Sequence, residues 1–409
     1  MSIIDLLHNL LKEKLPGIHA TRLQALMAAV QAGLKGASVS ITQLGRSLSG
    51  PAYIKHKIKR MDRLAGNYHL NTERMEIYGA MTQWLLQSLP MPLILIDWSP
   101  LTTDQHPQLL RAALPTGGRS VTLYEEIHPV KKLGNRRIQQ RFLRRLQALL
   151  PANVVPIIVA DSGFRTPFFR EVENLGWHWL GRIRNRDFIA WVNRPNDWLA
   201  AKSLYAKATR KPKCLGSARW VRSHPLNGER VTFYRPAKGR IQLTAQHHPS
   251  KSSASRKHAK REKEPWLLVV SPSLKAFSAV RVVDYYRSRM QIEEGLRDTK
   301  STHYGLDFTS ESRIEAERRA NLLLIAALII FALWLTGICL KGTDIERHIK
   351  VNSGQGRSPY SVIFLARIAC RYVVFELSAS MLEQAQVLLV DYFDSLGGGK
   401  FVGIPQGLS

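Results

Sequence analysis

The segment at residues 320–340 contains no charged side chain, and it restricts the possible folds more than any other stretch of the chain. A helix of about 20 apolar residues is long enough to cross a membrane. A helix buried on all sides in the core of a large α/β domain has the same composition. Because the other helical segments are amphipathic, we expect a buried core helix. A basic protein anchored to a membrane by this segment is the alternative.

The chain carries a large positive charge. Its 409 residues include 59 Lys and Arg against 31 Asp and Glu, which leaves a formal net charge of +28. Such an excess repels itself in a compact protein unless a polyanion is the usual partner, and nucleic acid is the commonest one. A membrane surface is the other candidate. The length allows two or three domains with a real apolar core.

Three cysteines, Cys214, Cys339 and Cys370, lie far apart and show no CxxC spacing. They suit neither a disulfide framework nor a zinc site, and they fit a reducing cytoplasm. The N-terminus has an early Asp and no Lys or Arg ahead of its apolar residues, so we expect no signal peptide.

Residues 1–88 are predicted to be helical, because apolar side chains recur at helical spacing. Within them, residues 40–45 resemble the first helix and turn of a helix-turn-helix, and residues 53–64 would form a basic second helix. Such a helix binds DNA through phosphates or base edges. An ordinary solvated helix face is the alternative. The cations of the second helix are Lys55, Lys57, Lys59, Arg60 and Arg63.

Two short apolar runs that each end in an acid indicate buried strands, at residues 92–97 (PLILID) and 154–161 (VVPIIVAD). Continuous apolar runs of this length are typical of strands that are covered on both faces. Strands that alternate with amphipathic helices predict a mixed α/β sheet. Further strands are predicted at residues 109–114, 120–126, 179–184 and 265–271, and helices at 135–150, 167–175, 358–371 and 381–393.

Residues 185–262 differ in composition, being dense in Lys and Arg. Asn227-Gly228 stands between two strand-like runs, at residues 219–223 and 230–234, and this dipeptide is a strong signal for a hairpin turn. We therefore expect a basic β subdomain inserted into the α/β core, with a loose tail at residues 246–263.

One helix is predicted from about residue 280 to residue 300, and it ends in the sequence YYRSRMQIEEGLRDTK. Helical spacing would set five of its side chains in one stripe. The stripe could be a solvated surface with i,i+4 ion pairs or part of a site. Its members are Tyr286, Arg289, Glu293, Arg297 and Lys300.

Three carboxylates in this pattern suggest phosphodiester chemistry: Asp97 and Asp161 at strand ends, and Glu293 on the later helix. Converging carboxylates repel one another unless divalent cations lie between them. Two Mg²⁺ ions roughly 3.5–4 Å apart would activate a water or a 3′-hydroxyl and stabilise the leaving oxygen. A single acid at a strand end is more often a cap or turn residue, so the combination carries the prediction.

These residues resemble the DDE transposases of bacterial insertion sequences, specifically the cut-and-paste insertion sequence 4 family, close to the tetracycline-resistance composite transposon type. The family signature is Tyr, two residues, Arg, three residues, Glu, six residues and Lys. Tyr286, Arg289, Glu293 and Lys300 match it without a spacing departure. Asp97 in LILIDWS and Asp161 in VADSGF match the first two acids, and the similarity covers essentially the whole chain.

The resemblance implies an α/β fold with an RNase H-like catalytic core, interrupted by a β-strand insertion and flanked by helical N-terminal and C-terminal regions. The expected domains are a DNA-binding region at 1–88, the first part of the core at 89–184 and the basic β insertion at 185–262. The second part of the core at 263–340 and a helical C-terminal region for protomer pairing at 341–409 complete the chain.

The resemblance also assigns roles to residues. Asp97, Asp161 and Glu293 would be catalytic and would hold two Mg²⁺ ions, for which Mn²⁺ could substitute. Tyr286, Arg289 and Lys300 would bind DNA phosphates near the cut. Trp266 would stack on a flipped base, with a buried core tryptophan as the alternative. An arginine that follows the second acid also binds DNA in relatives, and both Arg184 and Arg182 are candidates. Arg297 lies outside the signature, and for it we expect an ordinary surface role.

The function implied is that of a metal-dependent transposase, both endonuclease and strand transferase. It would bind the terminal inverted repeats of an insertion sequence, cleave them, form and resolve a hairpin, and join the 3′-ends to target DNA. We expect a homodimer when the protein is assembled on double-stranded DNA, and a cytoplasmic, nucleoid-associated location in a bacterium without membrane attachment. A catalytically inactive DNA-binding protein derived from a transposase is the alternative.

Overall fold

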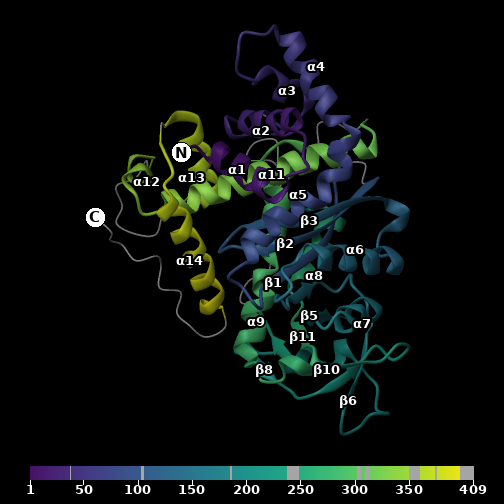
Figure 1. Ribbon diagram of the computed structural model, residues 1–409. Helices are drawn as coiled ribbons and strands as arrows, with labels where there is room; N and C mark the ends of the chain where they lie inside the picture. Colours follow the sequence, from purple (N-terminus) through teal and green to yellow (C-terminus); the bar gives the residue numbers. More distant parts are fainter. Residues whose placement is uncertain are drawn as a thin grey trace. The chain divides into compact units, whose positions relative to one another are not determined.

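The computed structural model describes the chain over most of its length and separates it into two compact units. The first unit contains Met1–Val154 and Met290–Ser395, and the second contains Val155–Arg289. Both combine helices with strands, so the predicted α/β class is confirmed (Figure 1). The described residues are 1–36, 38–102, 106–184, 187–236, 248–301, 305–308, 314–349, 360–373 and 375–396.

The first unit begins with the predicted helices. Side-chain caps explain several of their starts: Ser2 caps α1, Ser40 caps α3 and Asn67 caps α5, each by accepting a backbone N–H. A Cβ on Gly45 would lie 2.5 Å from Cα of Ile58, so only glycine lets α3 approach α4 this closely. The helices are α1 (Ile3–Lys14), α2 (Ala20–Leu34), α3 (Ile41–Arg46), α4 (Ile54–Ala65) and α5 (Tyr68–Leu86).

Helix α11 (Ala316–Leu340) is the core of the first unit. It is long and apolar enough to cross a membrane, but every residue of its most apolar window is buried inside the protein. It packs against α2, α5, α13 and β3, and Gly33 of α2 leaves the space that Ile329 occupies. The prediction of a buried core helix is confirmed, and the burial argues against the membrane alternative.

The sheet of the first unit is antiparallel, in the order β3-β2-β1. Its strands are β1 (Leu93–Pro100), β2 (Pro107–Pro115) and β3 (Ser120–Pro129), and α6 (Arg136–Leu149) packs against β3. The register places Asp97 opposite Arg111, and Arg111 opposite Glu125. A tight turn joins β2 to β3, in which Gly117 and Gly118 take positive φ values of 82° and 116°.

The second unit begins with a parallel pair, β4 (Ile157–Ala160) and β5 (His178–Ile183), connected through α7 (Thr166–Asn174). β11 (Trp266–Val270) pairs with β5 in the antiparallel sense and continues to β10 (Leu226–Tyr234). The basic insertion supplies the remaining strands: β6 (Phe188–Trp191), β7 (Leu199–Ala200), β8 (Lys213–Cys214) and β9 (Ala218–Trp220).

Two local predictions in the insertion were wrong. β9 and β10 pair as the predicted antiparallel hairpin, but Asn227 and Gly228 lie within β10, paired with Arg219 and Ala218, and not in its turn. The glycine is required by packing, because a Cβ there would collide with the side chain of Val269. The tail expected to be loose contains α8 (Ser253–Glu262), which begins where Ser252 accepts a hydrogen bond from the backbone N–H of Ser255 (3.1 Å). Residues 246 and 247 lie outside the described part of the chain.

The predicted helix at residues 280–300 is two helices, α9 (Ala279–Ser288) and α10 (Met290–Lys300). The hydroxyl of Ser288 donates to the carbonyl oxygen of Asp284 (3.2 Å), a bond that competes with the backbone ladder and favours a break at Arg289. The chain ends in α12 (Asp344–Ile349), α13 (Val362–Tyr372) and α14 (Ala379–Ser395); the last two occupy the predicted helical segments, of which residues 358 and 359 lie outside the description.

Gly228→Ala should lower the free energy of unfolding by about 1–3 kcal/mol, because the added methyl group overpacks the contact with Val269. Urea denaturation measures the change. Gly17→Ala is the matched control, since no atom lies within 4 Å of a Cβ at Gly17. Equal stabilities of the two variants would contradict the packing role of Gly228.

Candidate active site

Asp97 lies in β1, directly after the buried first half of the strand. Leu93 to Ile96 have almost no exposure, and the half-buried Asp97 follows them in β1. The backbone N–H of Trp98 donates to Oδ1 of Asp97 (2.8 Å). The bond fixes the orientation of the carboxylate, whose oxygens are hard ligands of the kind that Mg²⁺ prefers.

Lys300 reaches the same strand from the last turn of α10. Its ammonium donates to the hydroxyl of Ser99 (2.7 Å) and to the carbonyl oxygen of Pro100 (3.2 Å). Burial lowers the pKa of Lys300, the charge of Arg111 lowers it further, and the charge of Asp97 raises it. The first unit therefore places a partly desolvated cation within electrostatic reach of Asp97.

A buried ion pair lies behind these two residues. Nε of Arg111 donates to Oε2 of Glu125 (2.7 Å), and both side chains are about as buried as the apolar core, at 3% and 1% exposure. The pair is extended by Nη1 of Arg111, which donates to the hydroxyl of Thr299 (3.2 Å), and by the hydroxyl of Tyr78, which donates to Glu125 (3.0 Å). Burial and the neighbouring Glu125 raise the pKa of Tyr78. The network joins β2, β3, α5 and α10.

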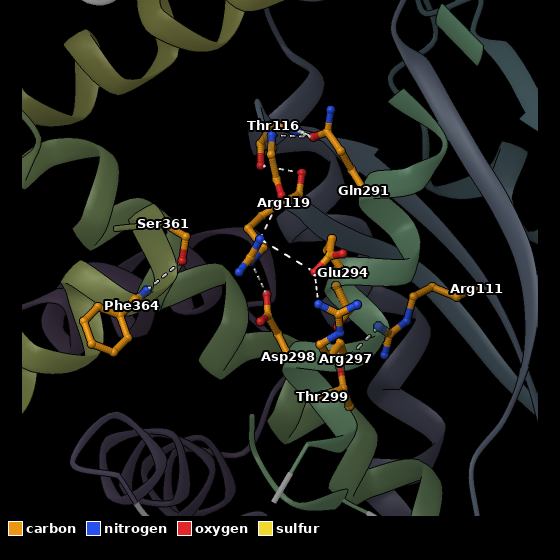
Figure 2. Close-up of polar contacts among 12 residues, drawn as sticks. Arg111, Thr116, Arg119, Gln291, Glu294, Arg297, Asp298, Thr299, Ser361 and Phe364 are labelled. Atoms are coloured by element: carbon orange, nitrogen blue, oxygen red, sulfur yellow. Dashed lines mark hydrogen bonds and ion pairs between the residues drawn. The ribbon is translucent and has the colours of Figure 1, made fainter. Parts of the chain in front are cut away.

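Glu293 lies in the first turn of α10 and is half-buried. The helix packs against β1, β2 and β3, and Gly295 leaves no room for a Cβ beside Ser120. On either side of Glu293 along the helix, the turn between β2 and β3 binds α10: Gln291 accepts backbone N–H groups, and Asp298 pairs with Arg119 (2.9 Å) (Figure 2). Burial raises the pKa of Asp298 to about 6, although the charge of Arg119 lowers it.

The sequence interpretation missed Gln291, Arg119 and Asp298. The first lies two residues before Glu293 and the last follows it within the same helix, so proximity to the signature was a usable signal. Arg297, by contrast, behaves as expected of a surface residue: its side chain is 58% exposed and pairs with Glu294 (2.8 Å).

Asp161 belongs to the second unit, directly after the buried strand β4. It accepts the backbone N–H of Gly163 through Oδ1 (2.8 Å). A Cβ at Gly163 would lie 2.9 Å from the same oxygen, which explains the glycine two residues after the acid. Phe164 is buried and anchors the turn that leads into α7.

The second unit also gathers aromatic and cationic side chains of α9 and β11. The rings of Trp266 and Tyr286 meet edge to face at 5.0 Å, and the guanidinium of Arg289 lies 5.7 Å from the Tyr286 ring centre. Trp266 is half-buried at the start of β11, so the fully buried alternative for this tryptophan does not hold. The Tyr286 hydroxyl is buried and has no hydrogen-bond partner among the described residues. A buried hydroxyl without a partner is costly unless a ligand supplies one.

Two arginines of the second unit differ in their partners. Nε of Arg184 donates to Glu264 (2.7 Å), so this guanidinium is already paired. Nε and Nη2 of Arg182, on β5, are buried and make no hydrogen bond within the described ranges. The geometry therefore favours Arg182 over Arg184 as the arginine that would accept an anion.

The predicted site residues thus fall into two sets. The first unit contains Asp97, Glu293 and Lys300, and the second contains Asp161 with the Trp266 cluster. Carboxylate oxygens are the hard ligands that Mg²⁺ prefers, so the donor set has the right chemistry. Over the described ranges, no group of three or more His, Cys, Asp or Glu side chains lies close enough to hold a metal ion.

A second buried polar cluster adjoins Trp98, whose ring lies 5.7 Å from that of His128. Glu126 accepts hydrogen bonds from Tyr124 (2.8 Å) and Arg145 (2.9 Å) and is bonded to His128 (2.8 Å). Burial alone would raise the pKa of Glu126, but the bonds from His128, Tyr124 and Arg145 lower it to about 2.

Comparison with known protein families gives a match over the region that contains Asp97, Asp161 and the Tyr286-Arg289-Glu293-Lys300 signature. The model described as the transposase DDE domain matches residues 88–329, which is more than half of the chain. A comparison with curated proteins found no match.

Glu126→Gln should lower the free energy of unfolding at pH 7 by about 3 kcal/mol, because the pKa of Glu126 falls from 4.5 to about 2 on folding. A depressed pKa stabilises the fold above pH 4.5, and this stabilisation is lost as the pH falls toward 2. The difference between the variant and the unmodified protein should therefore shrink below pH 4.5, as measured by urea denaturation. Glu383→Gln, at an exposed position, is the control; a pH-independent difference at Glu126 would refute the linkage.

Proposed function

The chain belongs to the transposase DDE-domain family, and from that premise we propose that it is a cut-and-paste transposase of the insertion sequence 4 type. Membership of the family makes it an enzyme of DNA transposition that acts on DNA. The finer proposal is that it binds the terminal repeats of an insertion sequence, cleaves them, forms and resolves a hairpin, and joins the 3′-ends to target DNA. The complete Tyr286-Arg289-Glu293-Lys300 signature is the observation that carries this proposal.

Asp97, Asp161 and Glu293 are the proposed ligands of two Mg²⁺ ions, which Mn²⁺ could replace. When bound, the ions would supply an activated nucleophile and charge stabilisation for an in-line displacement at phosphorus. The protein's own part is positional. Asp97 follows the buried first half of β1, Asp161 directly follows β4, and each accepts a backbone N–H, so their carboxylates are held in one orientation.

Lys300 is proposed to bind a phosphate of the strand that is cut. Its ammonium is oriented by Ser99 and Pro100 and lies within the field of Asp97. A cation fixed in this way attracts a non-bridging phosphate oxygen to the carboxylate that would hold the metal. The same contact offsets part of the repulsion between the phosphate and Asp97.

The cluster around Trp266 is proposed to bind the DNA next to the cut. Half-buried Trp266 offers a face for a base taken out of the stack, as hairpin formation requires. Tyr286 and Arg289 would then bind the adjoining phosphates, and the Tyr286 hydroxyl would gain the partner that the described part of the protein does not supply. Arg182 would contribute a further phosphate contact.

Several broader features belong to the same proposal. The core is of RNase H type, supported by the antiparallel order β3-β2-β1 in one unit and the parallel pair β4-β5 in the other. The α3–α4 pair would bind DNA through the exposed cations of α4, and two protomers would pair through the C-terminal helices on DNA. The large positive charge supports action at the bacterial nucleoid.

Asp97→Ala, Asp161→Ala and Glu293→Ala should each abolish metal-dependent cleavage of a duplex that carries the inverted repeat flanking the gene. Binding to the same duplex should persist, because the carboxylates repel rather than attract phosphates. Removal of the metal with a chelator should stop cleavage by the unmodified protein, and Mg²⁺ or Mn²⁺ should restore it. Gel-based cleavage and mobility-shift assays measure both properties.

Asp197→Ala, at an exposed acid between β6 and β7, is the matched control and should leave cleavage unchanged. Cleavage retained by any of the three site variants would refute its assignment. An unmodified protein that binds the repeat but cuts it under no metal condition would favour the inactive DNA-binding alternative.

Arg182→Ala should weaken binding to the repeat and lower the slope of log affinity against log salt by about one, as loss of a phosphate contact does. Arg184→Ala should leave that slope unchanged and act on stability, because it removes the partner of Glu264. Fluorescence anisotropy over a series of salt concentrations distinguishes the two. The reverse outcome would assign the DNA contact to Arg184.

A further inference from the structure

The proposed metal ligand Glu293 lies on a helix whose first turn depends on tertiary contacts. The helix is interrupted at Arg289, so α10 begins anew at Met290, three residues before Glu293. Rotation of the first turn about the helix axis would move the Glu293 carboxylate. Contacts that fix the first turn therefore also fix the orientation of this carboxylate.

Gln291 holds this turn through both ends of its amide. Its oxygen accepts the backbone N–H of Thr116 (3.0 Å), as Figure 2 shows. It also accepts the backbone N–H of Gly118 (2.9 Å), in the same turn between β2 and β3. Its nitrogen donates to the hydroxyl of Tyr392, on α14 (2.7 Å). Acceptor and donor bonds on opposite sides leave the amide one orientation.

Tyr392 touches both partners of this arrangement. It is buried, and its ring lies against Gly117, where a Cβ would come 3.5 Å from the ring. At its other end the β2–β3 turn pairs with α10 again, through Arg119 and Asp298 (2.9 Å). The turn is thus bound by Gln291, Glu294 and Asp298 of α10 and contacted by Tyr392 of α14.

Helix α14 makes this contact from a lightly packed position. Along its length only Ala385, Leu389 and Tyr392 are buried among the described residues. Gln386 adds a hydrogen bond to the carbonyl oxygen of Trp84 (2.9 Å). An element with few buried side chains can leave its site at low free-energy cost, and Tyr392 would leave with it.

We infer that Gln291 and Tyr392 are positioning residues that make the orientation of Glu293 depend on the docking of α14. When α14 is docked, Tyr392 holds the Gln291 amide. The amide fixes the first turn of α10 against the β2–β3 turn, and this fixes the orientation of the Glu293 carboxylate. Release of α14 loosens that turn without removing any ligand. The inference rests on the proposed function in one respect, the role of Glu293 as a metal ligand.

Tyr392→Phe tests the link with the least disturbance, because it removes one hydroxyl and keeps the buried ring. The turnover number for cleavage of the repeat duplex should fall roughly tenfold, since small displacements of a catalytic group are costly, while the KM for the duplex stays the same. Amide hydrogen exchange in residues 290–295 should become faster, and binding of Mn²⁺ to the protein–DNA complex, followed by electron paramagnetic resonance, should weaken. Val192→Ala, at a 59% exposed position after β6, is the control and should change none of these.

A double-mutant cycle separates positioning from general packing. Gln291→Ala should reproduce the loss in turnover, and Tyr392→Phe should add almost nothing in the Gln291→Ala background, because both changes break the same chain of contacts. Additive losses, or unchanged exchange in residues 290–295 after Tyr392→Phe, would overturn the inference. Glu293→Ala keeps the two hypotheses distinguishable: if it still cleaves, the proposed site fails, and if it is inactive while Tyr392→Phe is unaffected, only the positioning inference fails.

Discussion

The buried pair of Arg111 and Glu125 is the interaction on which the first unit depends. Two charges at 3% and 1% exposure are tolerated only with complete hydrogen bonding, and Thr299 and Tyr78 help to complete it. Loss of one partner would leave a buried charge, at a cost of about 3–5 kcal/mol. The pair therefore favours one register of β2 against β3 and one position for the C-terminal end of α10. Asp97 opposite Arg111, and Lys300 next to Thr299, take their places from this network.

Asp97 and Asp161 could be predicted because each directly follows a continuous run of apolar residues, which is the sequence pattern of a buried strand. The same reasoning failed wherever tertiary contacts decide. Gly228 was interpreted as a turn residue, but it serves the approach of Val269. Helix α8 was not predicted from composition, because its start depends on the Ser252 cap. The break at Arg289 was not predicted from periodicity, because it is favoured by the hydroxyl of Ser288, which donates to the carbonyl oxygen of Asp284. The periodicity of apolar residues describes one element at a time, so it does not show contacts between elements or between a side chain and the backbone.

The site shows the same division. The signature and the two acids that follow apolar runs could be found in the sequence, because the chemistry demands particular residue types at particular places. The choice between Arg182 and Arg184 could not be made from the sequence. It depends on Glu264, which is distant in the sequence and forms an ion pair with Arg184. Gln291 lies close to the signature in the sequence, but its role could not be found there, because that role comes from the N–H groups of a turn and from Tyr392.

Electrostatics links these local features to the charge of the whole chain. Lys300 is kept partly desolvated beside Arg111, and both effects lower its pKa. A phosphate next to Lys300 would raise this pKa again. Binding of DNA would therefore offset the unfavourable free energy of keeping a desolvated cation in this place. The same holds for the chain as a whole, whose net charge of +28 opposes compaction until a polyanion neutralises it. A ligand that binds the folded state also stabilises it by mass action. Binding of DNA and stability of the proposed site are therefore coupled, and the site should be best ordered when its substrate is present.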